Sequence, residues 1–247
     1  MKARTSILSI FLGMTILLSS CDTLQQVANE GGILSNGGTP TAAEMSSGLK
    51  QALQIGLQDG VKQVSAVDGF FKNPLIKIAF PPDAQKVESA LRSIGLNQLC
   101  DNVTLSLNRA AENASKEATT IFLNALKQMS FQDVTQILLG PDTAATGYFK
   151  RVTTSQLKAK FEPIVANNLG KVGATRYWSD VMTKYNSIPL VKPINPDLND
   201  YVTQQAINGL FVMIAGKEKQ IRQNISARTT PLLQKVFGYA AQQKGKG

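Results

Sequence analysis

Apolar residues recur every three or four positions along most of residues 41–242, and this spacing restricts the fold more than any other feature of the sequence. In the first segment they are Met45, Leu49, Leu53, Leu57, Val61 and Val64. Such spacing places the apolar side chains on one face of an α-helix, whereas a half-buried strand would alternate apolar and polar residues. We therefore predict an all-α fold in which several helices bury their apolar faces in one core.

Local signals predict where the helices begin and end. Thr41 and Glu44 form a capping box, and Ser130 can cap a shorter helix that ends at Gly140. Neither an internal repeat nor a linker interrupts residues 41–242, so we expect a single multi-helix domain there. The other expected helices cover residues 83–94, 98–128, 144–151, 155–168, 173–185, 197–223 and 230–242.

Small and extended segments refine this expectation. Gly56 and Gly60 lie on a face next to the first apolar stripe, where the missing side chains would let another helix approach closely. Residues 74–80 form a short apolar run that could be a strand. Residues 188–194 contain two prolines, which exclude a helix interior because each removes a backbone donor. These two segments could pair as one short two-stranded β element.

The amino terminus has the organisation of a bacterial lipoprotein signal. Two basic residues precede an apolar run over residues 7–18, which is shorter than the roughly 20 residues that a transmembrane helix needs. The following Leu18-Ser19-Ser20-Cys21 resembles a lipobox, in which the cysteine thiol receives diacylglycerol and the signal is cut just before it. We expect a signal peptide over residues 1–20 and a lipid on Cys21. Ordinary cleavage with a free cysteine and an uncleaved anchor are the alternatives.

The segments at the two ends of the domain have the composition of linkers. Residues 21–40 contain two Gly-Gly pairs and few large apolar residues, which favours a flexible, lipidated tether. Residues 243–247 form a basic tail. Asp22 resembles an inner-membrane retention signal of enteric bacteria, but that rule differs between bacterial groups. We therefore expect a lipid-anchored protein of the bacterial cell envelope, at the outer membrane or the periplasmic face, with the leaflet left open.

The chain contains no histidine, and this excludes several kinds of active site. Ser-His-Asp triads, Cys-His pairs, H-E-x-x-H zinc sites and proximal-histidine haem sites all need that side chain. Nucleotide-binding glycine motifs are missing as well. We predict no catalytic set, no metal site and no cofactor. Cys100, the second cysteine, has apolar neighbours and no adjacent cation, which indicates a small buried residue instead of a reactive thiol.

Two weak patterns leave a hydrolase as an alternative. Ser47 with Lys50 and Ser155 with Lys158 have the S-x-x-K spacing at which a lysine can activate a serine, but neither K-T-G nor S-D-N accompanies them. Asp197-Leu198-Asn199-Asp200 holds two carboxylates that could act as acid and base. A favourable interaction with the dipole of a helix is the simpler explanation of these carboxylates.

Positive charge is concentrated towards the carboxy end. The formal net charge is +9, and loss of Lys2 and Arg4 with the signal would lower it to +7. Nucleic acid is not an expected partner, because export separates the protein from it and no nucleic-acid module is recognisable. An anionic ligand or a membrane surface could instead contact the basic residues Lys217, Lys219, Arg222, Arg228 and Lys235.

Several short segments resemble the family known as domain of unknown function 4197. The resemblance extends over about residues 41–238, and it implies an exported bacterial protein, often a lipoprotein, that is predominantly helical. It supplies no activity. The segments that carry it are Gly48-Leu49-Lys50-Gln51-Ala52-Leu53, Asn73-Pro74-Leu75-Ile76-Lys77-Ile78, Pro81-Pro82, Ala144-Ala145-Thr146-Gly147-Tyr148-Phe149, Val191-Lys192-Pro193, Tyr201-Val202-Thr203, Gly209-Leu210-Phe211, Ile221-Arg222, Ala227-Arg228-Thr229-Thr230 and Val236-Phe237-Gly238.

These observations together predict a lipid-anchored, non-catalytic binding or scaffold module. It would bind envelope lipid, glycan or another envelope protein through its basic residues or through a pocket between helices. Aromatic pairs such as Tyr148-Phe149 could line that pocket, although core packing explains them more simply. A cell-envelope hydrolase that uses a Ser/Lys pair or paired carboxylates is the alternative.

Overall fold

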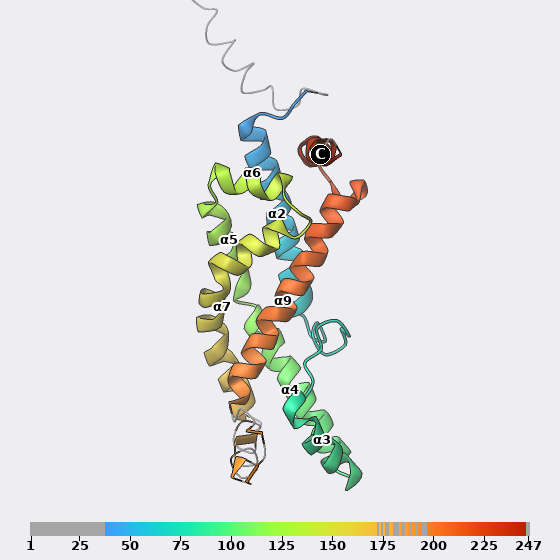
Figure 1. The fold of residues 1–247 in the computed structure, drawn as a ribbon, viewed down its shortest axis with the longest axis vertical. Coiled ribbons are helices and arrows are strands. Elements are labelled where there is room, and N and C mark those ends of the chain that lie inside the picture. The colour runs from blue at the N-terminus through green and yellow to red at the C-terminus, as the bar shows by residue number, and fades with distance from the viewer. Residues whose placement is uncertain are drawn as a thin grey trace, which may run out of the picture. The chain divides into compact units, whose positions relative to one another are not determined.

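Eight α-helices make up most of what the computed structural model describes, namely residues 38–171, 173, 175, 178, 179, 183, 186, 187, 189, 190, 192, 193 and 197–245. The 3-10 turns η2 (Pro82–Ala84) and η3 (Ile225–Ala227) precede α3 and α10. Figure 1 shows the arrangement. The helices are α2 (Ala42–Ser65), α3 (Gln85–Ser93), α4 (Asn97–Ser115), α5 (Ala118–Gln128), α6 (Phe131–Leu139), α7 (Ala144–Lys171), α9 (Leu198–Gln223) and α10 (Pro231–Lys244).

The all-α fold class is confirmed. Residues 37–247 form one compact unit, and no strand occurs in its described part. The predicted signal peptide, the lipidated Cys21 and the tether up to residue 37 lie outside the described residues. So do most of the predicted helix 173–185 and the last two residues of the basic tail.

Side-chain caps begin four of the helices, because the first amides of a helix have no partner within it. Thr41 and Ser130 each form a capping box, with Glu44 and Asp133 respectively, as the sequence predicts. Thr230 accepts a hydrogen bond from the amide of Leu233 at the start of α10. Asp197 accepts from two amides in the first turn of α9. These local bonds fix the helix starts that the sequence indicates.

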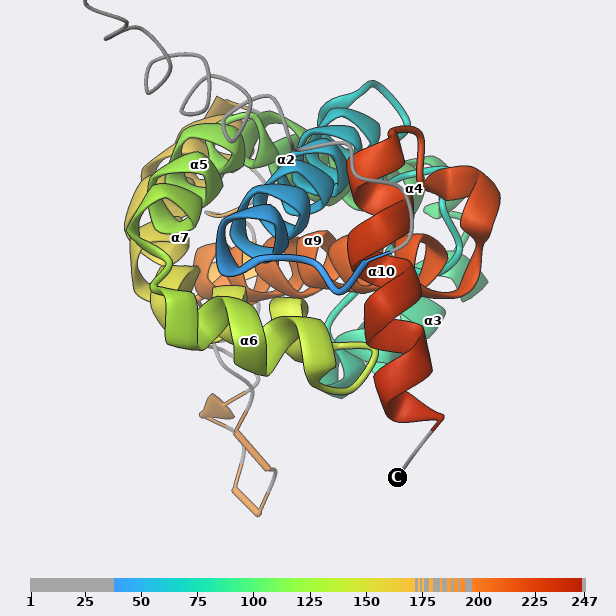
Figure 2. The same ribbon diagram turned by 90° about the horizontal axis from the view of Figure 1, so that it is seen from above.

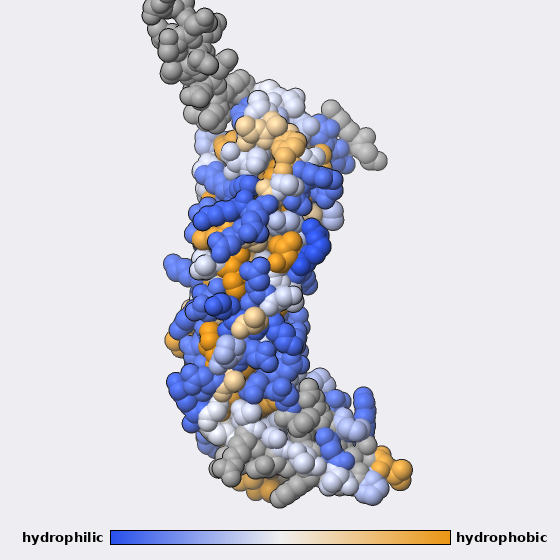
Figure 3. Space-filling view, turned by 90° about the vertical axis from the view of Figure 1, so that its left-hand side faces the viewer, coloured by the Kyte–Doolittle hydropathy of each residue, from blue (hydrophilic) through white to orange (hydrophobic). Residues whose placement is uncertain are grey.

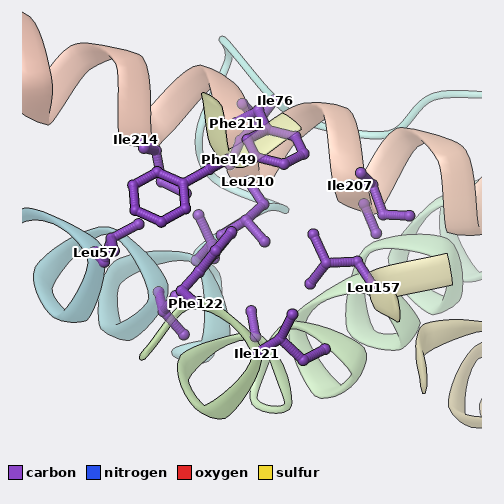
Figure 4. Close-up of a cluster of buried hydrophobic side chains, with 14 of the residues drawn as sticks. Leu57, Ile76, Ile121, Phe122, Phe149, Leu157, Ile207, Leu210, Phe211 and Ile214 are labelled. Carbon is purple, nitrogen blue, oxygen red and sulfur yellow. The ribbon is translucent and has the colours of Figure 1, made fainter. Parts of the chain in front are cut away.

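Helix α9 is the centre of the packing. It contacts α2, α4 and α7, and Figure 2 shows it running between the surrounding helices. Phe211 of α9 meets Phe122 of α5 with ring centroids 5.9 Å apart, and Phe122 meets Phe149 of α7 at 5.6 Å, both edge to face. Figure 4 shows that apolar side chains from these helices point toward one another. The apolar faces predicted from the spacing therefore form one shared core.

Glycines in α2 allow two helices to approach it, as predicted for Gly56 and Gly60. A Cβ at Gly56 would lie 3.5 Å from Cδ1 of Ile221, and one at Gly60 would lie 3.6 Å from Cγ1 of Ile214. Both neighbours belong to α9. Gly48 is closer still to α10, because a Cβ there would lie 2.7 Å from Cγ2 of Val236.

Two predicted helix boundaries are wrong. The expected helix 98–128 is two helices, because the chain turns at Lys116 and Glu117 and thereby directs α5 against α2 and α7. The expected helices 144–151 and 155–168 are one helix, α7, which continues through Pro163. Thr153 lies between the two predicted segments, and its hydroxyl donates to the carbonyl of Phe149 at 2.6 Å within the helix.

The predicted β element is wrong as well, as far as the chain is described. Residues 74–80 are turn and coil, and the described residues of 188–194 are not strand. The side chain of Asn108 in α4 takes the place of a neighbouring strand. Its Oδ1 accepts from the amide of Ile78 at 2.8 Å, and its Nδ2 donates to the Ile78 carbonyl at 2.8 Å. A side-chain amide thus satisfies the backbone groups for which strand pairing was predicted.

Candidate functional site

Arg222, one of the five predicted basic contact residues, lies in the interior. Its side chain is 6% exposed, and its Nη2 lies 2.9 Å from Oε1 of Glu218, which is 4% exposed. The guanidinium also donates to the carbonyls of Ile137 at 2.7 Å and Leu138 at 3.2 Å. These carbonyls belong to the last turn of α6, where a cation is favourable. Arg222 therefore holds the end of α6 against α9.

Glu218 holds the start of α7 against α9. Its carboxylate accepts hydrogen bonds from the amides of Ala145 at 2.9 Å and Thr146 at 2.8 Å, and from the Thr146 hydroxyl at 2.8 Å. An anion at the amino end of a helix is stabilised by the free amides and by the helix dipole. The buried pair of Glu218 and Arg222 is thus a joint between α6, α7 and α9.

Arg228 and Lys235 are also occupied within the fold. Arg228 is buried and donates from Nε to the Ile221 carbonyl at 3.1 Å, which caps the end of α9. Burial lowers the pKa of the Arg228 guanidinium. Lys235 binds the buried Glu44 carboxylate at 2.7 Å. Lys219 is exposed and Lys217 is half-buried. The five residues therefore do not form one exposed basic face.

A polar hollow of about 440 Å³ lies between α5, α6 and α7. Its volume is in the range of small-molecule sites, roughly 300–1,000 Å³. Figure 3 shows the side of the molecule that carries α5 and α7, which is mainly hydrophilic with separated apolar residues. The residues that line the hollow are Asn124, Ala125, Lys127, Gln128, Asp133, Tyr148, Arg151, Val152 and Gln156.

Three lining groups have fixed positions. The Tyr148 hydroxyl donates to the carbonyl of Ala125 at 3.3 Å, and burial raises the pKa of this phenol. The Arg151 guanidinium lies over the Tyr148 ring, 5.4 Å from its centroid. Asp133 accepts from the Ser130 hydroxyl at 2.6 Å and from the Ser130 amide at 3.0 Å. These bonds lower the pKa of Asp133, and the charge of Arg151 lowers it further, so the carboxylate is ionised at neutral pH.

Five polar side chains of the hollow, Arg151 included, make no salt bridge or hydrogen bond with a described residue. Lys127 and Arg151 form neither a salt bridge nor a hydrogen bond with any residue in the described ranges. The same holds for the side-chain amides of Asn124, Gln128 and Gln156. Two cations and three amides, all of them exposed residues, therefore line one hollow with hydrogen-bond donors that no described residue occupies.

Comparison with known proteins identifies the family. Residues 39–238 match the family described as protein of unknown function (DUF4197). The chain belongs to this family. The match confirms the resemblance seen in the sequence. No curated protein and no solved structure matches the chain.

The hydrolase alternative gains no support from the DUF4197 domain. Lys158 is bound to Asp200 at 2.9 Å, so this lysine is not poised as a base for Ser155. Ser47 is exposed on the surface of α2. Asp197 accepts from backbone amides at the start of α9, as expected for a helix cap. The candidate serine, lysine and carboxylate groups are thus on the surface or take part in helix contacts.

Cys100 of the DUF4197 domain is fully buried, as predicted. Its Sγ lies 4.0 Å from the carbonyl of Glu88, and burial raises the pKa of the thiol. Several aromatic residues belong to the core: Phe70 and Phe149 are fully buried, and Trp178 packs on Phe80 with ring centroids 6.3 Å apart. Tyr148 is buried as well and borders the hollow.

The described part of the chain has neither a membrane-spanning helix nor a cluster of metal ligands. No α-helix there is both long enough and apolar enough to cross a bilayer. No group of three or more Cys, Asp or Glu residues could hold a metal ion in the same residues.

Sequence reasoning missed the hollow of this DUF4197 protein. Its lining residues are ordinary surface residues within their own helices, and no motif links Lys127 of α5 to Arg151 of α7. The packing of α5 against α7, which brings these residues to one hollow, depends on the turn at residues 116 and 117, and the sequence did not indicate that turn. The sequence shows an excess of cations over anions, but it does not show that Lys127 and Arg151 line the same hollow.

Proposed function

We propose that this protein is a lipid-anchored, non-catalytic binding module of the bacterial cell envelope, and that its ligand occupies the hollow between α5, α6 and α7. One observation carries the proposal. The buried charges pair with each other or cap helices, as Glu218 with Arg222 does, whereas Lys127 and Arg151 form no salt bridge or hydrogen bond with a described residue. Two cations with unused hydrogen-bond donors in a hollow of ligand size favour binding.

The anchor rests on the lipobox-like segment that ends at Cys21. A two- or three-chain lipid would hold the protein firmly, since each buried methylene contributes about 0.8 kcal/mol. The test is native mass spectrometry of the full chain extracted from its own membrane. We expect a chain that begins at Cys21 and carries acyl mass. A chain that still begins at Met1, or a Cys21→Ser variant that stays equally membrane-bound after a high-salt wash, would refute the anchor.

Native mass spectrometry also tests whether the hollow holds the ligand. We expect the extracted chain to retain a small ligand, and Val152→Trp to remove that ligand by filling the hollow. Val152 is partly exposed in the wall, so the larger side chain needs no rearrangement of the core. Val212→Trp is the matched control, because Val212 is exposed on α9 and does not line the hollow. Equal ligand retention in both variants would exclude the hollow as the binding site.

A further inference from the structure

The charges of the hollow specify the kind of ligand. Lys127 and Arg151 contribute two positive charges, and the ionised Asp133 contributes one negative charge, which leaves a net charge of +1. Asp133 carries one negative charge and also accepts hydrogen bonds from Ser130 at the start of α6, so it cannot neutralise both cations. An anionic group would therefore be attracted between α5 and α7.

The donors of the hollow suit a phosphodiester that carries hydroxylated arms. Arg151 offers a planar fork of N–H donors, Lys127 a compact point charge, and the three side-chain amides further N–H donors. A phosphodiester has two charged oxygens, to which Arg151 and Lys127 can donate, and unlike a simple carboxylate it carries a substituent on either side. The hollow, at about 440 Å³, has room for more than a phosphate ion. Hydroxylated arms beside the phosphate could reach the amides of Asn124, Gln128 and Gln156.

The position of the hollow is consistent with a membrane ligand. The hollow includes the last turns of α5 and the first turn of α6, and α6 packs against α2. Figures 1 and 2 both place α6 beside the first turns of α2, which follow the predicted tether. A tether of residues 22–40 would reach roughly 25 Å as a random coil. The hollow thus lies near the start of α2, the helix that the predicted tether precedes in the sequence.

We infer that the hollow binds the glycerophosphoryl group of an anionic phospholipid or of its soluble counterpart, with Arg151 and Lys127 on the phosphate oxygens. This inference rests on the proposed binding function and specifies its ligand. Both sources share a phosphodiester flanked by hydroxylated carbons. The experiment below separates them.

The first measurement uses a soluble probe, so that attraction to a charged surface plays no part. The full chain in a non-ionic, phosphate-free detergent is titrated with glycerophosphoglycerol and followed by ³¹P NMR at about 0.3 M NaCl, where the Debye length is roughly 6 Å. We expect saturable binding. The double variant Lys127→Gln with Arg151→Gln should bind at least tenfold more weakly, equivalent to about 1.4 kcal/mol.

The control removes the same charge elsewhere. Lys62→Gln with Lys160→Gln changes two exposed lysines that do not line the hollow, so its affinity should stay within twofold of the wild type. Equal urea midpoints would show that both double variants are folded. Equal weakening in the two variants, or no saturable binding to the wild type in either arm, would overturn the inference.

The second measurement identifies the source. Vesicles with phosphatidylglycerol and vesicles with oleate, both in phosphatidylcholine, are compared by flotation. Preference for phosphatidylglycerol that is lost in the Lys127/Arg151 variant supports a lipid headgroup, whereas binding of glycerophosphoglycerol alone supports a soluble phosphodiester. If Val152→Trp removes the native ligand while the charge variant retains it, the hollow remains a binding site and the phosphodiester assignment fails.

Discussion

At the scale of single residues, Glu218 shows how one buried carboxylate can join separate helices. It belongs to α9, accepts from two amides at the start of α7, and pairs with Arg222, which in turn donates to the end of α6. A buried charge costs free energy unless it is paired and hydrogen-bonded, and here each charge meets helix ends of the opposite sign. Removal of one member should therefore cost far more than loss of a surface pair.

We predict that Glu218→Gln lowers the free energy of unfolding by about 3–5 kcal/mol, because it leaves the Arg222 charge uncompensated in the interior. Urea unfolding followed by circular dichroism measures this change. Asp142→Asn is the control, since it breaks a half-exposed pair with Lys244 and should cost less than about 1 kcal/mol. Similar losses in the two variants would show that the interior pair is not a structural joint.

Cys100 should be chemically unreactive in the folded protein because its thiol is buried. Burial raises the pKa of its thiol, and the thiolate is the reactive form. We predict that the full chain with Cys21→Ser, in which Cys100 is the remaining cysteine, does not react with Ellman's reagent at about pH 8 until urea unfolds it. Rapid reaction of the folded protein would contradict the buried placement.

The sequence could not show which basic residues are consumed within the fold. Lys235 and Glu44 form an ion pair although 191 positions separate them. Arg228 caps the end of α9, the helix that precedes it. In the sequence it appears only as one more positive charge close to that helix. A cluster of cations along the chain becomes a binding surface only if long-range packing leaves it exposed, and here the packing uses Arg222, Arg228 and Lys235.

At the scale of helices, predictions from local chemistry succeeded, whereas the helix boundaries and the strand pairing that depend on tertiary contacts were predicted wrongly. The capping boxes at Thr41 and Ser130 involve residues three positions apart, so the sequence contains all of their determinants. The turn at Lys116 and the continuity of α7 across residues 152–154, where a break was predicted, depend on what each helix packs against. The pairing of Asn108 with Ile78 is likewise a tertiary contact, and it replaced the predicted strand.

The contact between α2 and α10 yields a prediction about glycine. Gly48→Ala should destabilise the protein by about 1–3 kcal/mol, because the new Cβ would lie 2.7 Å from Cγ2 of Val236. Gly216→Ala is the matched control, since α9 has open space there, and it should stabilise by about 0.5–1 kcal/mol through helix propensity. Thermal unfolding of both variants checks the signs, and stabilisation by Gly48→Ala would argue against a close α2–α10 contact.

The same pair of helices makes stability depend on pH. The hydrogen bond from Lys235, followed by that from the Thr41 amide, holds the pKa of Glu44 below its ordinary value. As the pH falls, the Glu44 carboxyl of the unfolded chain is protonated at a higher pH than that of the folded chain. The stability that the ion pair contributes is therefore present above about pH 4.3 and is lost as the pH falls through the folded pKa. Lys235→Met should therefore flatten the loss of stability between about pH 6 and pH 3.

Urea midpoints across that pH range measure this effect. Lys62→Met serves as the control, because Lys62 is exposed and forms no ion pair with a described residue. Its pH profile should run parallel to that of the wild type. A Lys235→Met profile with the wild-type slope would mean that the α2–α10 ion pair contributes nothing to acid sensitivity.

At the scale of the whole molecule, the fold class follows from spacing, whereas the candidate site does not. Leu49, Leu107, Phe149 and Leu210 are all buried, and each lies on an apolar stripe that the sequence displays. The hollow instead requires three helices to meet at defined angles, and its lining residues carry no periodic signal. The binding function is therefore a property of the assembled helices and could be proposed only from their arrangement.

One shared core also predicts that the domain unfolds as a unit. Trp178 packs on Phe80, just before η2 and α3, while Phe237 belongs to α10, which packs on α2 and α6. Phe237→Ala should cost about 3–5 kcal/mol. Because the core is continuous between these two places, the urea midpoint of Trp178 fluorescence should fall together with that of circular dichroism. A fluorescence midpoint that stays at the wild-type value while the circular dichroism midpoint falls would divide the domain into two independently folding parts.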